Sequence, residues 1–569
     1  MRRLFCTGLL LVLALTLAPG ALADTGAPGP PVAPAAAGSV PIASDPAPGP
    51  HRRPAPIPLR ATADYRVSSI RAGIVGLGLV VFAWGLGLAR ESRGGLRRVR
   101  LGLLLLLAGL AFASYYQFFR LVHVGGFATN DNFHYYVGSK YFAELGYFGL
   151  YECSLAALAD RGFAIPDDGR GKARDLRTMQ ERPLREILKA GQSCRERFSA
   201  ERWHSFQNDV YYFVHRWPPH VLRAVWRDHG YHPSPTWTLI GGTVASSTSI
   251  HEPFAQYVLS RLDRYIVGIG IVMVAWAFGL ESACLVAIVW GTGFIWRYTW
   301  VGDAFLRHLW WITALAGVCL IRRDRHLAGG AWLSTSALLR IFPACMSLGY
   351  LLHAGRAAWY EGRFGVGAGR FLLGAGVTAV LLVGLGVSTS QHGLTSLLDF
   401  ATKITDFAAL STTNQVGLSV LARWAFPETP WAATLLRLMI LVPFLALFWR
   451  GLRHAEAWEA AAFGLCLVPM LTEPTSYYFS FMAICALLAA RRPHIGVIVL
   501  LTGLLWCLNG LVFYRQYDEY RWASLIAVSA CFAIAAGMTR DAGLSATAES
   551  ASTETPLAKR SSGSPIRAA

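Results

Sequence analysis

Charged residues are scarce in this chain, and acidic residues are absent from its long apolar stretches. Only 15% of the 569 residues are Asp, Glu, Lys or Arg, whereas 54% are hydrophobic. Five blocks are mostly apolar and contain no Asp or Glu: 74–88, 101–113, 265–280, 371–387 and 495–512. Each block is long enough, or nearly so, to cross about 30 Å of hydrocarbon as a helix. This composition excludes a large soluble core and predicts an all-α polytopic membrane protein.

Acidic residues are also outnumbered by basic ones, and this imbalance indicates topology rather than nucleic-acid binding. The formal net charge is +18. Much of the basic excess lies in short segments beside apolar blocks, where Lys and Arg mark the cytoplasmic side. Tracing the chain from one basic segment to the next predicts about 12–13 transmembrane helices. No internal repeat is apparent, which disfavours a transporter built from inverted halves.

The two ends of the chain differ from its middle. Residues 1–24 are typical of a signal peptide, or of an uncleaved first anchor, because two arginines precede an apolar run and small residues follow it. Residues 25–66 are rich in Pro and Ala and predict a disordered linker outside the membrane. Residues 539–569 predict a disordered cytoplasmic tail.

Between these ends, hydrophobicity and charge predict three regions. We expect the first two transmembrane helices in 67–121, an extracytoplasmic loop with interfacial helices in 122–264, and the transmembrane bundle in 265–538. A single span over Ala328 to His353 would place Arg356 outside, against the charge rule. Pro343 predicts instead two short helices, broken near Arg340 to Pro343, that enter from the cytoplasm and return to it.

Two cysteines stand apart from the apolar helices. Cys153 and Cys194 share the long loop, where an oxidising compartment would allow a disulfide, but the spacing leaves free thiols equally open. The remaining helical cysteines are small apolar fillers and show no metal-ligand spacing.

The most informative polar residues follow the second predicted helix. Asp131 opens a segment rich in aromatics, including Tyr135 and Phe142, that suits the surface of a bilayer. A carboxylate at that depth is partly desolvated, which raises its pKa and makes it a better base. The alternative is that Asp131 only caps the interfacial helix.

Short motifs along the chain resemble those of a known superfamily of membrane enzymes. They are the segment that opens at Asp131 and ends in Gly146-Tyr147 and Leu150-Tyr151, the hairpin Leu338-Leu339-Arg340-Ile341-Phe342-Pro343, and Asn414-Gln415 followed by Leu418 and Arg423. Together they look like elements of the GT-C membrane glycosyltransferases, particularly the polyprenyl-phosphate-sugar-dependent group called family 87. The likeness spans about 101–538. An additional helix precedes the usual first one, the outer loop is longer than usual, and Arg340 stands where Lys is common.

The resemblance implies a GT-C-like bundle that transfers a sugar from a polyprenyl phosphate to a glycan, lipid or protein acceptor on the extracytoplasmic face. It implies an acidic residue of the first outer loop as base, here Asp131, and His134, three residues on, would share its helical face and assist. Cations would stabilise the phosphate leaving group. The candidates are Arg340, Arg297, Arg307, His308 and Lys140.

A further set of polar and aromatic side chains suits the binding of sugar or acceptor. It consists of Tyr135, Asn414, Gln415, Glu473 and Tyr477. No cofactor is expected. A divalent metal on Asp228, His229 and His232 is possible in principle, but their spacing matches no strong pattern.

Simpler interpretations stay open for several of these residues. Arg297 is equally typical of an interfacial anchor, and Asp303 with Arg307 of a helix ion pair. Asn414 and Gln415 suit a helix cap, and Glu473 suits a turn before proline. Arg340 is harder to explain this way, because a guanidinium in an apolar run costs a few kcal/mol unless it has a partner.

At the level of the whole protein, the prediction is a glycosyltransferase in the bacterial inner membrane, with membrane lipids and a lipid-linked sugar as partners. Two alternatives are a transporter or flippase of a lipid-linked glycan and a non-catalytic scaffold for envelope assembly.

Overall fold

The computed structural model describes most of the chain between the two termini. The described residues are 59–88, 94–119, 128–163, 171–217, 219–362, 364–388, 390, 393–410, 412, 414–514 and 518–540. The predicted signal peptide or anchor (1–24), most of the predicted linker and the tail beyond 540 lie outside them. Residues 59–66 were expected in the linker but belong to the first helix, because no proline or glycine interrupts the chain between Pro58 and Gly73.

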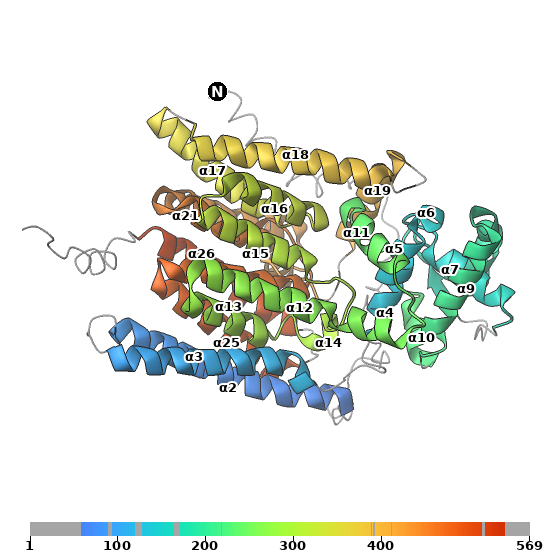
Figure 1. The fold of residues 1–569 in the computed structure, drawn as a ribbon, viewed down its shortest axis with the longest axis horizontal. Helices are drawn as coiled ribbons and strands as arrows, with labels where there is room; N and C mark the ends of the chain where they lie inside the picture. The colour runs from blue at the N-terminus through green and yellow to red at the C-terminus, as the bar shows by residue number, and fades with distance from the viewer. Residues whose placement is uncertain are drawn as a thin grey trace, which may run out of the picture.

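The protein is an all-α membrane protein whose helices form a bundle of roughly parallel rods (Figure 1). Helices α2 and α3 run along one edge of the bundle, and α18 runs along the opposite edge. The bundle helices are α2 (Leu59–Leu88), α3 (Gly94–Tyr115), α12 (Pro253–Phe278), α13 (Leu280–Thr292), α15 (Leu309–Arg322), α16 (His326–Leu339), α17 (Ala344–Glu361), α18 (Val366–Ser388), α21 (Pro430–Gly451), α22 (Ala457–Phe463), α25 (Pro493–Phe513) and α26 (Asp518–Met538).

Five helices in the described part of the chain are long and apolar enough to cross a membrane. They cover Val67–Gly87, Val366–Ser388, Pro430–His454, Pro493–Phe513 and Asp518–Met538. Shorter apolar helices, such as α13 and α15, are buried inside the bundle, and most side chains of α15 are enclosed. A helix that is apolar on every side belongs inside a bundle, since no polar face is available for water.

The predicted break of the helix near Arg340 to Pro343 is confirmed. Helix α16 ends at Leu339, Arg340 is extended, and α17 begins after Pro343. Proline cannot donate the backbone hydrogen bond that a continuous helix would need there. Helix α16 then packs closely on α18, because a Cβ at Gly330 would lie only 2.2 Å from the carbonyl oxygen of Phe371.

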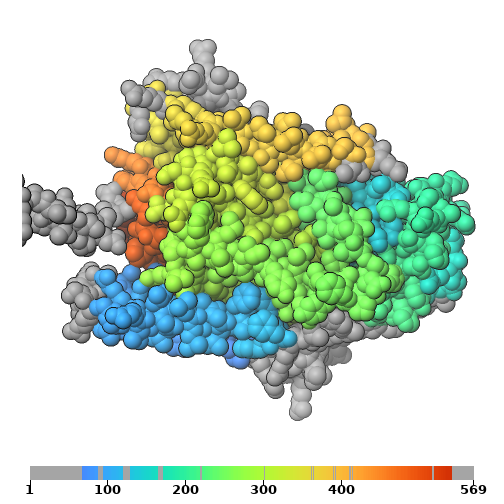
Figure 2. Space-filling model, in the orientation of Figure 1, coloured from blue at the N-terminus to red at the C-terminus, as the bar shows by residue number. Residues whose placement is uncertain are grey.

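A smaller unit, which we call the cap (residues 128–251), covers one end of the bundle (Figures 1 and 2). It is built from short helices and one two-stranded hairpin. Its elements are α4 (Thr129–Asn132), a π-helical turn (Phe133–Val137), α5 (Gly138–Lys140), α6 (Phe142–Leu145), α7 (Leu150–Asp160), β1 (Lys172–Arg174), β2 (Glu181–Pro183), α8 (Leu184–Ala190), a 3₁₀ turn (Gly191–Arg197), α9 (Ala200–Val214), α10 (Pro219–Val225) and α11 (Pro235–Ser246). The cap ends before α12, so this helix starts inside the segment expected to be loop.

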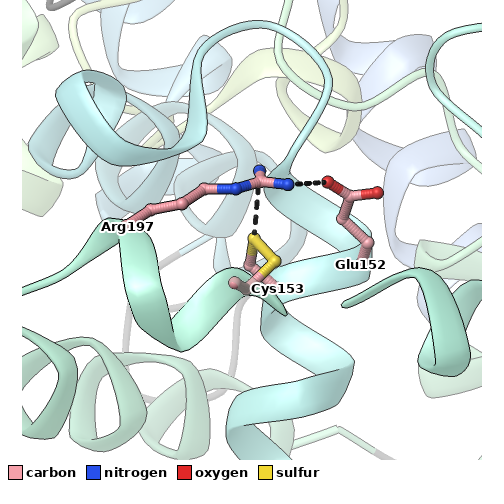
Figure 3. Close-up of a disulfide and its surroundings, with 4 residues drawn as sticks. Glu152, Cys153 and Arg197 are labelled. Carbon is pink, nitrogen blue, oxygen red and sulfur yellow. Dashed lines mark hydrogen bonds and ion pairs between the residues drawn. A yellow bond between two sulfur atoms is a disulfide. The ribbon is translucent and has the colours of Figure 1, made fainter. Parts of the chain in front are cut away.

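A disulfide joins two elements of the cap. Cys153 on α7 is bonded to Cys194 in the 3₁₀ turn, which settles the pairing that the sequence left open. Arg197 lies over this bond, with a nitrogen 3.1 Å from a carboxylate oxygen of Glu152 (Figure 3). The disulfide therefore ties the start of the cap to its middle, across a separation of 41 residues.

A second contact attaches the cap to the segment before α20 (Leu418–Ala425). Helix α19 (Thr395–Ala409) places Lys403 against the cap hairpin, where its Nζ lies 3.3 Å from the carbonyl oxygen of Leu176 and 3.3 Å from the sulfur of Met179. The Lys403 side chain is fully enclosed. Burial lowers the pKa of Lys403 to about 7.

Removing the disulfide should loosen the cap. For a loop of this length, the chain-entropy account predicts that replacing Cys153 and Cys194 by Ser costs about 4 kcal/mol. We expect faster proteolysis within the cap and a lower melting temperature. Reductant should bring the wild type to the level of the double variant and leave the variant unchanged; a wild type indifferent to reductant would contradict the pairing.

The buried lysine should make stability depend on pH. Lys403 binds its proton less tightly when folded than when unfolded, so the unfolded state holds more protons between about pH 7 and pH 10.5. The wild type should therefore gain stability as pH rises through this window, and Lys403→Met should not. Melting curves at pH 7 and pH 9.5 should show the variant several degrees more stable at pH 7, with the difference shrinking at pH 9.5. Lys189→Met, at an exposed position of α8, is the control; a pH-independent difference would refute the assignment.

Candidate functional site

Asp131 lies at the start of the cap, where the chain meets the bundle. Its Oδ1 is 3.4 Å from Nη1 of Arg307, and its side chain remains 25% exposed. Its Oδ2 is buried and has no hydrogen-bond partner among the described residues. The capping alternative is wrong, because α4 begins at Thr129 with Ala128 at the cap position. The carboxylate is thus free of a local structural task.

Two arginines from different parts of the bundle approach the same aromatic ring. Arg307 precedes α15 and Arg340 stands at the break between α16 and α17. Their guanidinium carbons lie 5.1 Å and 5.6 Å from the ring centre of Tyr135. Both arginines are buried, with 5% and 9% of their surfaces exposed. The two arginines, which are 33 positions apart in the sequence, therefore form one cationic cluster.

Tyrosines complete the walls of this cluster. The Arg307 guanidinium lies 4.4 Å from the ring centre of Tyr477, and that of Arg340 lies 5.7 Å from Tyr478. Nη2 of Arg340 is 3.4 Å from the hydroxyl of Tyr135. We call Asp131, Tyr135, Arg307, Arg340, Tyr477 and Tyr478 the arginine site.

The arginine site carries more positive than negative charge. Among the described residues, Asp131 is the one carboxylate that pairs with an arginine of the site, namely Arg307, and Arg340 has no carboxylate partner. The Nε atoms of Arg307 and Arg340 are buried without a hydrogen-bond partner in the same set of residues. Burying guanidinium groups without matching acceptors is costly, so the arrangement favours an anionic ligand.

His232 forms the edge of the site that faces the cap. Its Nε2 is 3.4 Å from the hydroxyl of Tyr135, and its ring stacks on Phe407 at 5.2 Å with an angle of 9°. Burial, reinforced by Arg340 and Arg307, lowers the pKa of His232 well below its usual value. The imidazole is therefore neutral at pH 7 and adds no further positive charge.

His134 was predicted to share a helical face with Asp131, but its ring contacts other residues. Its Nδ1 lies 2.9 Å from the carbonyl oxygen of Asn130 and 4.0 Å from Asp228, and its Nε2 lies 2.7 Å from the hydroxyl of Tyr151. The reason is the π-helical turn at Phe133–Val137, where side chains follow a different spacing from that of an α-helix.

Asp228 is a second carboxylate near this turn. Its Oδ1 accepts the backbone N–H of His229 at 2.8 Å and lies 3.0 Å from the Nδ1 of the same residue. Burial alone would raise the pKa of Asp228, but the hydrogen bond from His229 and the nearby His134 lower it below its usual range. With 43% of its side chain exposed, Asp228 is an ionised carboxylate accessible to a ligand.

Several predicted cations lie in other ion pairs instead. Lys140 is 2.7 Å from Asp209, Arg297 is 2.7 Å from Glu519, and His308 is 2.8 Å from Asp263. Each contacts a carboxylate far away in the chain, a pairing that the sequence alone does not predict. Arg297 is 3% exposed, so the interfacial-anchor alternative is also wrong.

The predicted ion pair between Asp303 and Arg307 is wrong as well. Asp303 is paired with Arg264 at 2.8 Å and also accepts the hydroxyl of Tyr298, whereas Arg307 turns to Asp131. Asp303 has a positive φ of 54°, so no regular helix connects the two residues.

Three predicted binding residues, Asn414, Gln415 and Glu473, make contacts with residues outside the arginine site. Gln415 forms an isolated antiparallel bridge with Thr475, and the carbonyl of Asn414 accepts the backbone N–H of Ser476 at 2.8 Å. Glu473 pairs with Arg423 at 2.7 Å on the exposed side. Neither Asn414 nor Gln415 caps α20, whose cap position is Gly417. These contacts hold the segment that presents the two tyrosines of the site.

The described residues give no support to the Asp228, His229 and His232 metal set. Among them, the group with suitable ligand geometry is Glu152 with Cys153 and Cys194. Those cysteines are already joined in the disulfide, so they do not offer thiolate ligands.

An apolar groove of about 980 Å³ lies between α3 and α12 and ends near the cap. Phe112, Tyr257 and Trp276 contribute to its walls, and Arg261 and Arg264 line it as well. Arg264 pairs with Asp303, whose carbonyl accepts the side-chain amide of Asn132 at 3.2 Å. One rim of the groove is thereby connected to the residue next to Asp131.

Comparison with protein-family models, with curated proteins and with solved structures finds no match to this chain.

Proposed function

We propose that the chain is a GT-C-type membrane glycosyltransferase that moves a hexose or pentose from a polyprenyl phosphate to an acceptor hydroxyl, by a single displacement with inversion. The observation that carries this proposal is the arginine site. Two buried guanidinium groups, lined by tyrosines, lie beside one partly exposed carboxylate. This is the charge distribution that a phosphate leaving group and a general base require.

In this mechanism Arg307 and Arg340 bind the phosphate of the donor. As the bond between the anomeric carbon and the phosphate oxygen breaks, negative charge grows on that oxygen. The unpartnered Nε atoms of both arginines offer hydrogen bonds to it. The hydroxyls of Tyr135, Tyr477 and Tyr478 line the site with neutral polar groups, so they do not repel the anion.

Asp131 acts as the base. It takes the proton of the acceptor hydroxyl while that oxygen attacks the anomeric carbon, and the lipid phosphate departs on the opposite side. Arg307, 3.4 Å from Oδ1, orients the carboxylate and connects the base to the leaving-group site. His134 is too engaged with Tyr151 and Asn130 to share this task.

Asp228 is the candidate for orienting the acceptor. Its Oδ1 is saturated by His229, so the carboxylate is fixed while its exposed Oδ2 can accept a hydroxyl. Carbohydrate sites commonly pair such fixed acceptors with ring faces, and Phe407 lies beside both His229 and His232.

The lipid chain of the donor fits the apolar groove between α3 and α12. The groove opens along exposed apolar side chains of α12, including Ile269 and Val272, and is connected to Asn132 through Arg264 and Asp303. A polyprenyl chain lying there would keep its tail in the hydrocarbon and its phosphate near the cap.

Charge and the disulfide support an extracytoplasmic cap. A disulfide is stable in an oxidising compartment, which favours the extracytoplasmic side of a bacterial inner membrane for the cap. The basic segments at the other end of the helices favour the cytoplasm for that end. With about a dozen spans, the bundle would then carry the arginine site at the outer boundary, beneath the large extracytoplasmic loop.

Asp131→Asn tests the base. The amide keeps the shape of the side chain but cannot accept the proton, so sugar transfer from a synthetic polyprenyl phosphate donor should fall by about 10²–10⁴-fold. Donor binding should persist. Asp324→Asn, at a 97% exposed position remote from the site, is the control. Unchanged turnover in Asp131→Asn would remove the proposed role, and vesicle transport of the lipid-linked sugar without transfer would support a flippase.

Arg340→Met tests the phosphate site through two opposite effects. Loss of one anion donor should reduce transfer by about 10²–10³-fold. Removal of a buried charge without a carboxylate partner should raise the melting temperature. Arg340→Lys should recover part of the activity, because the charge returns without the planar fork. A drop in both activity and melting temperature would indicate a structural arginine instead.

A further inference from the structure

A second basic hollow lies at the end of the bundle opposite the cap. It has a volume of about 470 Å³ and is formed by α17 and the short turn Leu452–His454 that follows α21. Its lining includes Arg356, Arg453, His353 and Tyr360, and none of its lining residues is acidic. Helices α17 and α21 both end on the side of the bundle away from the cap (Figure 1).

The two arginines of this hollow line a concave site without a carboxylate partner in the described part of the chain. Four arginines at the same end of the bundle are paired with carboxylates: Arg100 with Glu281, Arg322 with Glu456, and Arg491 and Arg492 with Glu459. Arg356 and Arg453 have no such partner among the described residues, and unlike the exposed, unpaired Arg97 and Arg98 they lie together in one hollow. The charge rule explains why arginines stand at this end, but it does not explain why these two line a concave site without an acid.

Aromatic contacts hold one of the two guanidinium groups in place. The guanidinium carbon of Arg356 lies 4.8 Å from the ring centre of Tyr360 and 5.3 Å from that of Trp449. His353 is fixed too, since its Nδ1 lies 3.2 Å from the carbonyl oxygen of Leu452. A ligand would therefore meet donors that are already oriented, which lowers the entropy cost of binding.

The surroundings of the hollow are those of a membrane boundary. Trp359 and Tyr360 are exposed at its rim, and the exposed Phe364 and Val366 follow on the connection to α18. Exposed aromatics at the end of an apolar bundle mark the headgroup level of a bilayer. The hollow thus combines positive charge at the headgroup depth with apolar surface where acyl chains run.

We propose that this hollow binds one anionic phospholipid, with its phosphodiester on Arg356 and Arg453 and its acyl chains along the exposed apolar side chains of α21. A basic pocket between membrane helices is complementary to such a headgroup. Its volume accommodates a phosphate with a small polar substituent. The site is separate from the arginine site and does not depend on the proposed sugar transfer.

Native mass spectrometry of the purified full-length protein tests the proposal. Phosphatidylglycerol and phosphatidylcholine with identical acyl chains are added in separate titrations, and glycerol 3-phosphate serves as the water-soluble arm. The wild type should bind one phosphatidylglycerol at least tenfold more tightly than phosphatidylcholine. Arg356→Gln with Arg453→Gln should lose this preference. Arg97→Gln with Arg98→Gln, an equal charge change at exposed positions of α3, should keep it.

Two further measurements keep the outcome decisive. Arg356→Lys with Arg453→Lys should retain part of the preference, and melting curves establish that each variant is folded. Preference retained in the folded Gln double variant would overturn the proposal, as would equal binding of the two lipids by the wild type. Displacement of the lipid by millimolar glycerol 3-phosphate would assign the site to a soluble phosphate compound and overturn the lipid.

Discussion

The structure depends on how buried guanidinium groups are neutralised. Most of them meet a carboxylate: Arg297 meets Glu519, and Arg264 meets Asp303. Arg307 shares Asp131, a carboxylate that is partly exposed and has one unpartnered oxygen, and Arg340 meets tyrosines alone. An ion pair buried in a membrane bundle must offset the free-energy cost of removing its charges from water. Arg340 has no carboxylate among the described residues to offset this cost, and this is the basis of the proposed phosphate site.

The backbone elements that present these groups are irregular. Asp131 lies just before a π-helical turn, Arg307 follows a segment with positive φ at Asp303 and Leu306, Arg340 is extended between two helices, and Tyr477 and Tyr478 lie in a 3₁₀ turn. Non-helical backbone at membrane depth is tolerated where protein covers it. Here the cap provides that cover, and the bridge from Gln415 to Thr475 supplies backbone hydrogen bonds that a helix would otherwise make.

What the sequence revealed about this site was local. Pro343 predicts the helix break at which Arg340 stands, and the position of Asp131 after an early helix marks it as a boundary carboxylate. The pairing of Arg307 with Asp131 joins residues 176 positions apart, and nothing in a single sequence distinguishes it from a pairing with the nearer Asp303. His232 and Tyr478 were missed as site residues for the same reason, because their roles depend on contacts between residues far apart in the chain, His232 with Tyr135 and Tyr478 with Arg340.

The two basic sites differ in how far their arginines are enclosed. At the arginine site, enclosure strengthens each charge and a neutral His232 prevents further repulsion, which suits a charge that develops during a reaction. At the opposite end, Arg356 and Arg453 line an open hollow beside exposed aromatics, where water weakens each contact and a permanent anion with an apolar tail gains most. In the two proposals, the same residue type meets a developing negative charge where it is enclosed and a permanent one where it is open to solvent.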